Sequence, residues 1–433
     1  MIYILSTLCV LMLCFNYMLD KDVLNPSVAF CGVFFVASFN VITNINLLGV
    51  NLGIDTVLVV FIGMLAISIG TIISRFFSHR YTIKRLLLLK KKHKFVENKF
   101  KLQLLLCFNI GSIIFILADV YWITVSRVNY SGNILKALSV YAEVSKFQNI
   151  DMKVSTLSTF LTATCEAEGY VLGYIIAKQF VKREHISTLL ILCFITAFVS
   201  TFCQGSRGGL FMLIALCVNY VEIFQGQNKV SLLKLIKPVL FFGFMVIGAF
   251  QIAGEVSGKN WNIGVYEYLS VYLGDPLINL DSALKDGIVR APIVGMVSFD
   301  GLMKKLARTF GFSIPLYIND FRVFRYSNGH NLGNVYTIFA YLIADFGIFG
   351  TFIALIVIGA FCEYFHQKSK KSVDDVSVFG IIYGYILACV VFSFFSNKIC
   401  EAITFYHFCV IVAIFAFKKY LTKKVIKSND LKV

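Results

Sequence analysis

Apolar runs of membrane-spanning length recur from one end of this sequence to the other, and this feature constrains the fold more than any other. A helix needs about 20 mainly apolar residues to cross roughly 30 Å of hydrocarbon. Eleven segments fit this requirement: residues 2–19, 27–44, 55–75, 102–124, 156–178, 186–203, 209–225, 238–254, 347–365, 376–395 and 399–417. The sequence therefore predicts an all-α polytopic membrane protein, with residues 1–433 forming a single integral membrane domain.

Basic residues predict how these spans are oriented. Residues 79–101 hold a dense run of Lys and Arg, which is typical of a cytoplasmic loop. Alternation from this loop places 26 of the 40 basic residues inside, with the N-terminus outside and the C-terminus inside. The net charge of +16 arises in these short loops beside the spans, so we expect no nucleic-acid partner.

Two loops on the predicted outer side are long, at residues 127–155 and 255–346. Neither is a low-complexity segment, so we expect both to fold on the membrane surface. Residues 265–284 and 299–310 show apolar residues at helical spacing, interrupted in the first by Asp275 and Pro276, and this predicts interfacial helices. Residues 331–346 are apolar but short, and we expect an outer-surface or re-entrant helix that leads into the next span.

Arginine is distributed unevenly between the two predicted sides. The inner loops hold 22 Lys and 4 Arg, whereas the outer loops hold 8 Lys and 6 Arg. The planar fork of arginine donates two parallel hydrogen bonds to a phosphate and keeps its charge. The outer arginines therefore indicate an anionic ligand, with lipid headgroups as the alternative: Arg127, Arg207, Arg290, Arg308, Arg322 and Arg325.

The segment QGSRGG, residues 204–209, places Arg207 between two predicted spans. Its glycines allow the backbone to turn tightly and to approach a ligand. An unpaired charge at membrane depth costs about 3 kcal/mol. The alternative is a tight turn whose arginine reaches the headgroups, but a turn needs the glycines and not the arginine.

Acidic and aromatic residues add candidates of a second rank. Glu166 lies within the fifth predicted span and Asp345 at the entry to the ninth, where acids are costly unless they are paired or hydrated. They are candidates for a substrate groove or a base, and a structural pairing fits equally well. Tyr336 is a candidate for stacking on a sugar, although membrane interfaces use tyrosine in the same way. The 12 cysteines occur singly and without a CxxC motif, which predicts no zinc site.

With these features the chain resembles the Wzy-type polymerases of O-antigen and capsule repeat units, and more distantly the O-antigen ligases. The resemblance rests on GSRGGL before a membrane helix, on the large outer loop between late spans, and on NVYTIFAYLIADFGIFG at the entry to the next span. It implies a membrane glycosyltransferase architecture in the bacterial inner membrane, a site that faces the periplasm, and no metal or cofactor.

Enzymes of this family transfer an undecaprenyl-pyrophosphate-linked glycan to a sugar hydroxyl of the incoming repeat unit. Cations near the headgroup plane stabilise the leaving diphosphate, and similarity to the arginine pair of the ligases points to Arg207 and Arg290. A base must take the hydroxyl proton, and similarity to the His-Asn pair of the ligases points to His330 with Asn331. The implied partners are the lipid-linked glycans, membrane lipid, a chain-length regulator and the flippase of the same pathway.

Three other functions fit the sequence less well. An O-antigen ligase would share the donor and the leaving group. A flippase or another secondary transporter would show repeated halves and charges along a central path, and the sequence contains no internal repeat. A scaffold without catalysis would not need arginines on the outer side.

Overall fold

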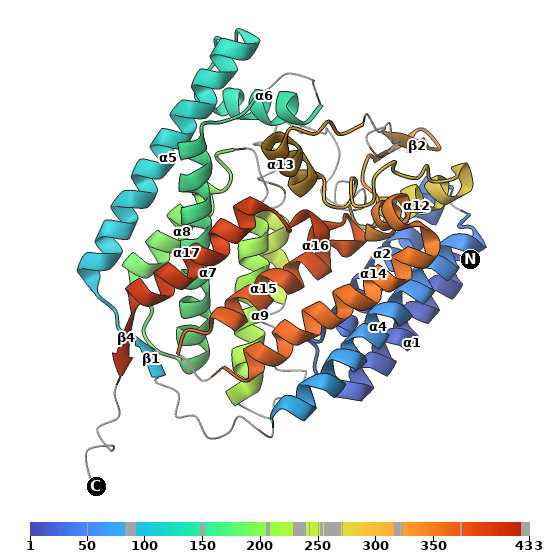
Figure 1. The fold of residues 1–433 in the computed structure, drawn as a ribbon, viewed down its shortest axis with the longest axis horizontal. Coiled ribbons are helices and arrows are strands. Elements are labelled where there is room, and N and C mark those ends of the chain that lie inside the picture. Colours follow the sequence, from blue (N-terminus) through green and yellow to red (C-terminus); the bar gives the residue numbers. More distant parts are fainter. Residues whose placement is uncertain are drawn as a thin grey trace. The chain divides into compact units, whose positions relative to one another are not determined.

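Long helices dominate the computed structural model of this chain (Figure 1), which describes residues 1–49, 51–82, 92–147, 152–204, 208–227, 240–241, 243–249, 251, 254, 270, 272–315, 321, 324–372 and 375–425. Six helices within the described residues are long and apolar enough to span a membrane: Ile2–Asp20, Pro26–Thr43, Ile54–Phe77, Lys99–Val128, Gly208–Gly226 and Ile338–Lys370. The predicted helical membrane class is thus confirmed, and these six helices coincide with six of the eleven predicted spans. The helices Thr188–Ser200 and Val378–Phe394 are apolar but shorter, and the predicted span at 238–254 lies partly outside the described residues.

The chain divides into two compact units. Unit 1 comprises Met1–Leu86, Asn262–Gln367 and Ile386–Phe405, and unit 2 comprises Leu87–Trp261, Lys368–Tyr385 and Tyr406–Val433. Each unit therefore combines segments that are distant in the sequence.

Four long helices form the frame of unit 1 (Figure 1): α1 (Ile2–Asp20), α2 (Pro26–Thr43), α4 (Ile54–Thr82) and α14 (Ile338–Lys370). Asn25 begins α2, because its side chain accepts a hydrogen bond from the Ser27 amide at 2.8 Å and Pro26 occupies the first helical position. Helices α4 and α14 approach at two glycines. A Cβ atom on Gly70 would lie 2.1 Å from the Ile356 carbonyl oxygen, and one on Gly359 would lie 2.4 Å from the Ile67 carbonyl oxygen. Small residues at these positions let the two backbones touch.

Short elements cover the end of unit 1 where α2 ends and α4 begins, and we call this the hairpin end. They are α3 (Ile45–Leu48), α12 (Asp275–Asp286), α13 (Asp300–Phe310), the antiparallel strands β2 (Arg325–Ser327) and β3 (His330–Gly333), the 3-10 turn η2 (Phe392–Phe394) and α16 (Lys398–Glu401). The Asp281 carboxylate fastens α12 to the start of α4, since it accepts hydrogen bonds from the Gly53 amide at 2.7 Å and the Thr56 hydroxyl at 2.6 Å.

The interfacial segments differ in part from the sequence prediction. Helix α13 matches the predicted helix at 299–310 to within one residue. Helix α12 begins at Asp275, and Pro276 fits its first turn, where the missing N–H of proline has no intrahelical role. The described residues just before it, 270 and 272–273, are also helical, and a turn at Gly274 separates them from α12, so the helical pattern is interrupted at this point as predicted. Residues 331–333 belong to a strand, and the helix that leads into the next span begins at Ile338.

Unit 2 is built around α7 (Thr156–Lys182), which packs against its neighbours along a core that includes Leu172, Leu190 and Leu213. Its other elements are α5 (Lys99–Val128), α6 (Ile134–Phe147), α8 (Thr188–Ser200), α9 (Gly208–Gln227), most of α15 (Val378–Val391) and α17 (Phe405–Leu421), and the paired strands β1 (Lys92–Phe95) and β4 (Thr422–Val425). Ser155 and Ser187 begin α7 and α8, because each side chain accepts a hydrogen bond from an amide in the first turn.

Candidate functional site

Helix α14 is broken near its start, at the hairpin end of unit 1. Gly347 has φ 70° and ψ 178°, values that no residue within a regular helix adopts and that glycine accepts without strain. The break frees backbone carbonyl groups of the preceding turn, and the segment before α13 satisfies two of them. The Ala291 amide donates to the Ala344 carbonyl oxygen at 2.8 Å, and Arg290 Nη2 donates to that of Asp345 at 3.4 Å.

Arg290 is exposed, and its guanidinium group lies over Gly347. A Cβ atom at residue 347 would be only 2.2 Å from Arg290 Nη1. The Asp345 carboxylate is fully buried and accepts hydrogen bonds from the Val297 amide at 3.0 Å and the Ser298 amide at 2.6 Å. Two predicted site residues, Arg290 and Asp345, therefore meet at the break, where Asp345 fixes the segment that carries the arginine.

His330 faces a second buried acid at the same end of unit 1. Its Nε2 atom lies 4.0 Å from Asp275 Oδ2, and the Asp275 side chain is only 1% exposed. Both Asp275 oxygens lack a hydrogen-bond partner among the described protein atoms. Burial raises the pKa of Asp275 to about 7, since a desolvated carboxylate is costly. The histidine and the acid form a pair suited to holding and passing a proton.

Further buried acceptors without a partner lie on the elements that pack around Asp275. They are Asn40 Oδ1, Asn279 Oδ1 and Thr337 Oγ1, again among the described atoms. Asn279 lies one helical turn after Asp275, and its amide nitrogen donates to the Leu332 and Val335 carbonyl oxygens at 3.1 and 2.9 Å. A Cβ atom on Gly274 would lie 2.6 Å from Asn40 Oδ1. Buried polar atoms in native proteins are rarely left unpaired, so several such acceptors around one buried acid are unusual.

Arg325, Tyr336 and Asn331 stabilise the strand hairpin. Arg325 forms an ion pair with Asp286 at 2.7 Å and donates from Nε to the Tyr336 hydroxyl at 2.8 Å. Burial alone would lower the pKa of Arg325, but these hydrogen bonds and the Asp286 charge outweigh it and raise the pKa. Tyr336 is fully buried against the Phe321 ring, and Asn331 Oδ1 accepts from the Gly333 amide at 2.9 Å.

The remaining predicted residues are dispersed over the chain. Arg308 is exposed in the last turn of α13. In unit 2, Arg127 is exposed in the last turn of α5, and the buried Glu166 accepts hydrogen bonds from the Tyr406 hydroxyl at 2.6 Å and the Tyr170 hydroxyl at 3.2 Å. Arg207 and Arg322 lie outside the described residues.

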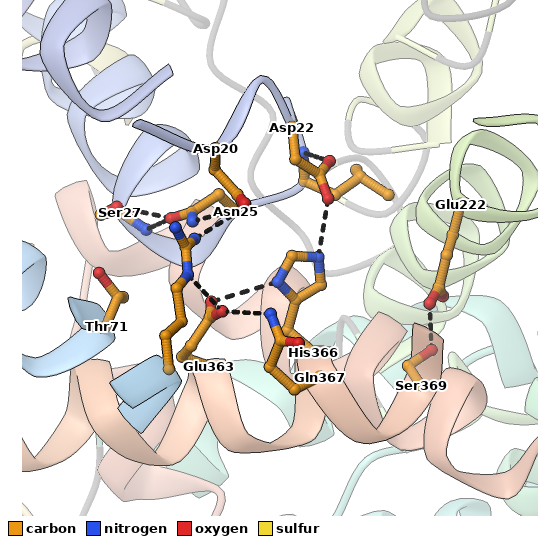
Figure 2. A network of polar contacts seen from close by, with 12 residues as sticks. Asp20, Asp22, Asn25, Ser27, Thr71, Glu222, Glu363, His366, Gln367 and Ser369 are labelled. Carbon is orange, nitrogen blue, oxygen red and sulfur yellow. Dashed lines mark hydrogen bonds and ion pairs between the residues drawn. The ribbon is translucent and has the colours of Figure 1, made fainter. Parts of the chain in front are cut away.

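A second group of charged side chains lies at the opposite end of unit 1, where α1, α4 and α14 end. We call it the charged network: Asp20, Asp22, Arg75, Glu363 and His366. Figure 2 shows His366 between Asp22 and Glu363, with Gln367 beside them. Arg75 joins Asp20 and Glu363, with 2.7 Å between the bonded atoms of each pair.

This network has the ligand types of a metal site but is arranged as a set of ion pairs. Ligand atoms of Asp20, Glu363 and His366 lie within 4.8 Å of one another. The Arg75 guanidinium group, however, already forms ion pairs with two of these three residues. A divalent cation would have to compete with it at close range, so the geometry favours the ion pairs.

Neither the pairing of Asp275 with His330 nor the charged network is predictable from the sequence. In the sequence, Asp275 is recognisable only as an interruption in an amphipathic helix. Glu363 and His366 fall within or beside the predicted span at 347–365, and an acid inside a span is a functional signal in its own right.

Comparison of the chain with protein-family models, curated proteins and solved structures finds no match in any of the three.

Proposed function

We propose that this chain polymerises undecaprenyl-pyrophosphate-linked oligosaccharide repeat units into a surface polysaccharide at the outer face of a bacterial inner membrane. The observation that carries this proposal is the pairing of His330 with the buried Asp275 at the hairpin end of unit 1. The resemblance of the sequence to the Wzy-type polymerases also supports this proposal. The apolar helices of membrane-spanning length support it as well.

The reaction requires a base beside the acceptor sugar. The acceptor hydroxyl oxygen forms a bond to the anomeric carbon of the donor, and its proton passes to His330 Nε2. A carboxylate 4.0 Å from that nitrogen stabilises the resulting imidazolium charge. Neither Asp275 oxygen has a hydrogen-bond partner among the described atoms, so no hydrogen-bond donor there competes with His330 for the charge of the carboxylate.

The reaction also requires a cation for the leaving group. When the bond between the anomeric carbon and the phosphate oxygen breaks, the electron pair leaves with the lipid diphosphate. Arg290 is exposed, and its Nη2 atom donates to the Asp345 carbonyl oxygen at 3.4 Å in the space that Gly347 leaves open, so its guanidinium group is placed at the helix break before the substrate binds. A preorganised guanidinium group stabilises such a developing charge better than a mobile one.

The test uses a strain that lacks the gene, complemented with the wild-type chain, with His330→Gln or with Arg290→Lys. We expect both variants to lose the ladder of long chains on a lipopolysaccharide or capsule gel while a single repeat unit remains on its acceptor. Arg290→Lys keeps the charge but loses the fork that grips phosphate.

The matched control is His185→Gln, which changes an exposed histidine between α7 and α8 and should leave the ladder unchanged. Immunoblots of the membrane fraction verify that each variant accumulates. Loss of every repeat unit from the acceptor in the deletion strain would instead indicate a ligase or a flippase. A normal ladder in His330→Gln would exclude His330 as the base.

A further inference from the structure

Two strands that are distant in the sequence pair at one end of unit 2 (Figure 1). Strands β1 and β4 form an antiparallel ribbon, which we call the basic ribbon. Helix α5 is long and apolar enough to span a membrane, and only residues 96–98 separate its start at Lys99 from β1. Helix α17 leads directly into β4, because Leu421 ends the helix and Thr422 begins the strand. A membrane that α5 spans would therefore have the basic ribbon at its surface.

One face of the basic ribbon is fixed against the core of unit 2. Phe95 packs against this core, and Thr422, which is its partner in register, is also buried. The Phe95 amide donates to Asp375 Oδ2 at 3.0 Å, so the end of β1 is tied to the segment before α15. Successive residues of a strand face opposite sides. Lys423, the residue after Thr422, is accordingly exposed.

Lysine dominates the basic ribbon and the residues that join it to the two helices. Residues 92–101 and 418–425 contain eight lysines and a single acid, Glu97. Asp375, which meets the end of β1, already forms an ion pair with Lys178 at 2.6 Å. These two acids therefore leave most of the positive charge of this surface unbalanced.

The register of the basic ribbon concentrates this charge. Lys94 stands opposite Lys423, and His93 stands opposite Lys424. Like charges at directly opposite positions destabilise an antiparallel pair. A ribbon of two strands is itself only marginally stable in water. The pairing of β1 with β4 therefore carries a cost that an anionic partner would reduce.

We propose that the basic ribbon is a binding surface for the headgroups of anionic phospholipids, and that these lipids stabilise the pairing of β1 with β4. The position of the ribbon at the start of a membrane helix brings the phosphate groups of the bilayer within reach. Lysine binds phosphate as a point charge without a fixed geometry, which suits a fluid layer of headgroups. The basic ribbon belongs to unit 2, and this proposal does not depend on the polymerase activity proposed above.

Hydrogen exchange by mass spectrometry measures the pairing in the full-length protein in lipid nanodiscs. One set of nanodiscs contains phosphatidylcholine alone, and the other contains phosphatidylcholine mixed with anionic phosphatidylglycerol. Amides of residues 92–95 and 422–425 should exchange about fivefold more slowly in the mixed nanodiscs, the factor that corresponds to one lysine near an anionic surface. High salt should remove this difference, because it screens charges at a surface.

Lys423→Gln separates the two effects of the charge. In phosphatidylcholine alone it should slow exchange of the basic ribbon, because it removes the repulsion between residues 94 and 423. In the mixed nanodiscs it should reduce the protection that the anionic lipid gives. Lys136→Gln is the matched control, because it changes an exposed lysine of α6 and should alter neither value.

Three results would overturn the proposal. The first is equal exchange of the basic ribbon in the two sets of nanodiscs. The second is faster exchange of Lys423→Gln in phosphatidylcholine alone, because Lys423 would then stabilise the pairing without lipid. The third is the same protection by inorganic phosphate added to phosphatidylcholine nanodiscs, because the surface would then bind free phosphate instead of lipid.

Discussion

Replacing Asp275 by Asn should stabilise the protein at alkaline pH while it removes the proposed activity. The Asp275 carboxyl group is buried with no hydrogen-bond partner among the described atoms, and its pKa rises from an ordinary value of 3.8 to about 7. A pKa change of this size corresponds to about 4 kcal/mol in favour of the neutral acid in the folded protein. Asparagine has nearly the same shape and carries no charge at any pH.

The sign of the effect follows from proton binding. Below about pH 3 the carboxyl group is protonated in both the folded and the unfolded chain, so its burial costs little. As the pH rises toward 7, the unfolded chain releases this proton before the folded chain does, and unfolding becomes progressively easier. The free-energy cost of burying the ionised Asp275 carboxylate reaches its full value above about pH 7. Between pH 4.5 and pH 8 this cost grows by about 3 kcal/mol.

The measurement is thermal unfolding of the purified protein at pH 4.5 and pH 8. The melting temperature of Asp275→Asn, relative to wild type, should be higher at pH 8 than at pH 4.5 by about 5 °C. Asp300→Asn is the matched control, because it makes the same chemical change in an exposed side chain of α13 and should show no such pH dependence. An equal difference at both pH values, or a loss of stability at pH 8, would show that His330 already neutralises an ionised Asp275 and would refute the reasoning.

Three further changes test the fold and the predicted site. Gly70→Ala should destabilise the protein by about 1–3 kcal/mol in a thermal unfolding measurement, because the new Cβ atom would collide with the Ile356 carbonyl group. Gly111→Ala is the control and should not destabilise the protein, because its Cβ atom would meet open space. Arg325→Lys should lose one of two hydrogen bonds at the hairpin and cost about 1–2 kcal/mol, detected as faster proteolysis between α13 and α14. Arg207→Lys should abolish long chains on the gel but keep a single repeat unit, and a normal ladder would remove Arg207 from the site.

The helices of this protein were largely predictable because the length of an apolar run fixes the length of a span. The break in α14 was not. Gly347 sits inside an apolar run, and nothing in its neighbours distinguishes a break from a packed glycine such as Gly70. The difference lies in residues 290–298, which satisfy the carbonyl groups that the break frees.

Site residues could be predicted from the sequence only where a local motif or an unusual charge marks them. His330 was identified through its resemblance to a His-Asn pair, but its partner Asp275 lies 55 positions earlier and carries no local signal. The charged network illustrates the same limit, since its members come from α1, the α1–α2 corner, α4 and α14. Each member looks like an ordinary residue near the end of a span until the helices are assembled.

The two ends of unit 1 differ in how their buried polar groups are satisfied, and this difference indicates where a ligand gains most by binding. In the charged network, Arg75 or His366 lies within 3.2 Å of each carboxylate, so any rearrangement there loses ion pairs. At the hairpin end, acceptors of Asp275, Asn40 and Asn279 have no partner among the described atoms, so a rearrangement that brings donors to them gains hydrogen bonds. A ligand shifts a conformation only through contacts that differ between the two states. Sugar hydroxyls are such donors, and on this ground we propose that the glycan binds at the hairpin end.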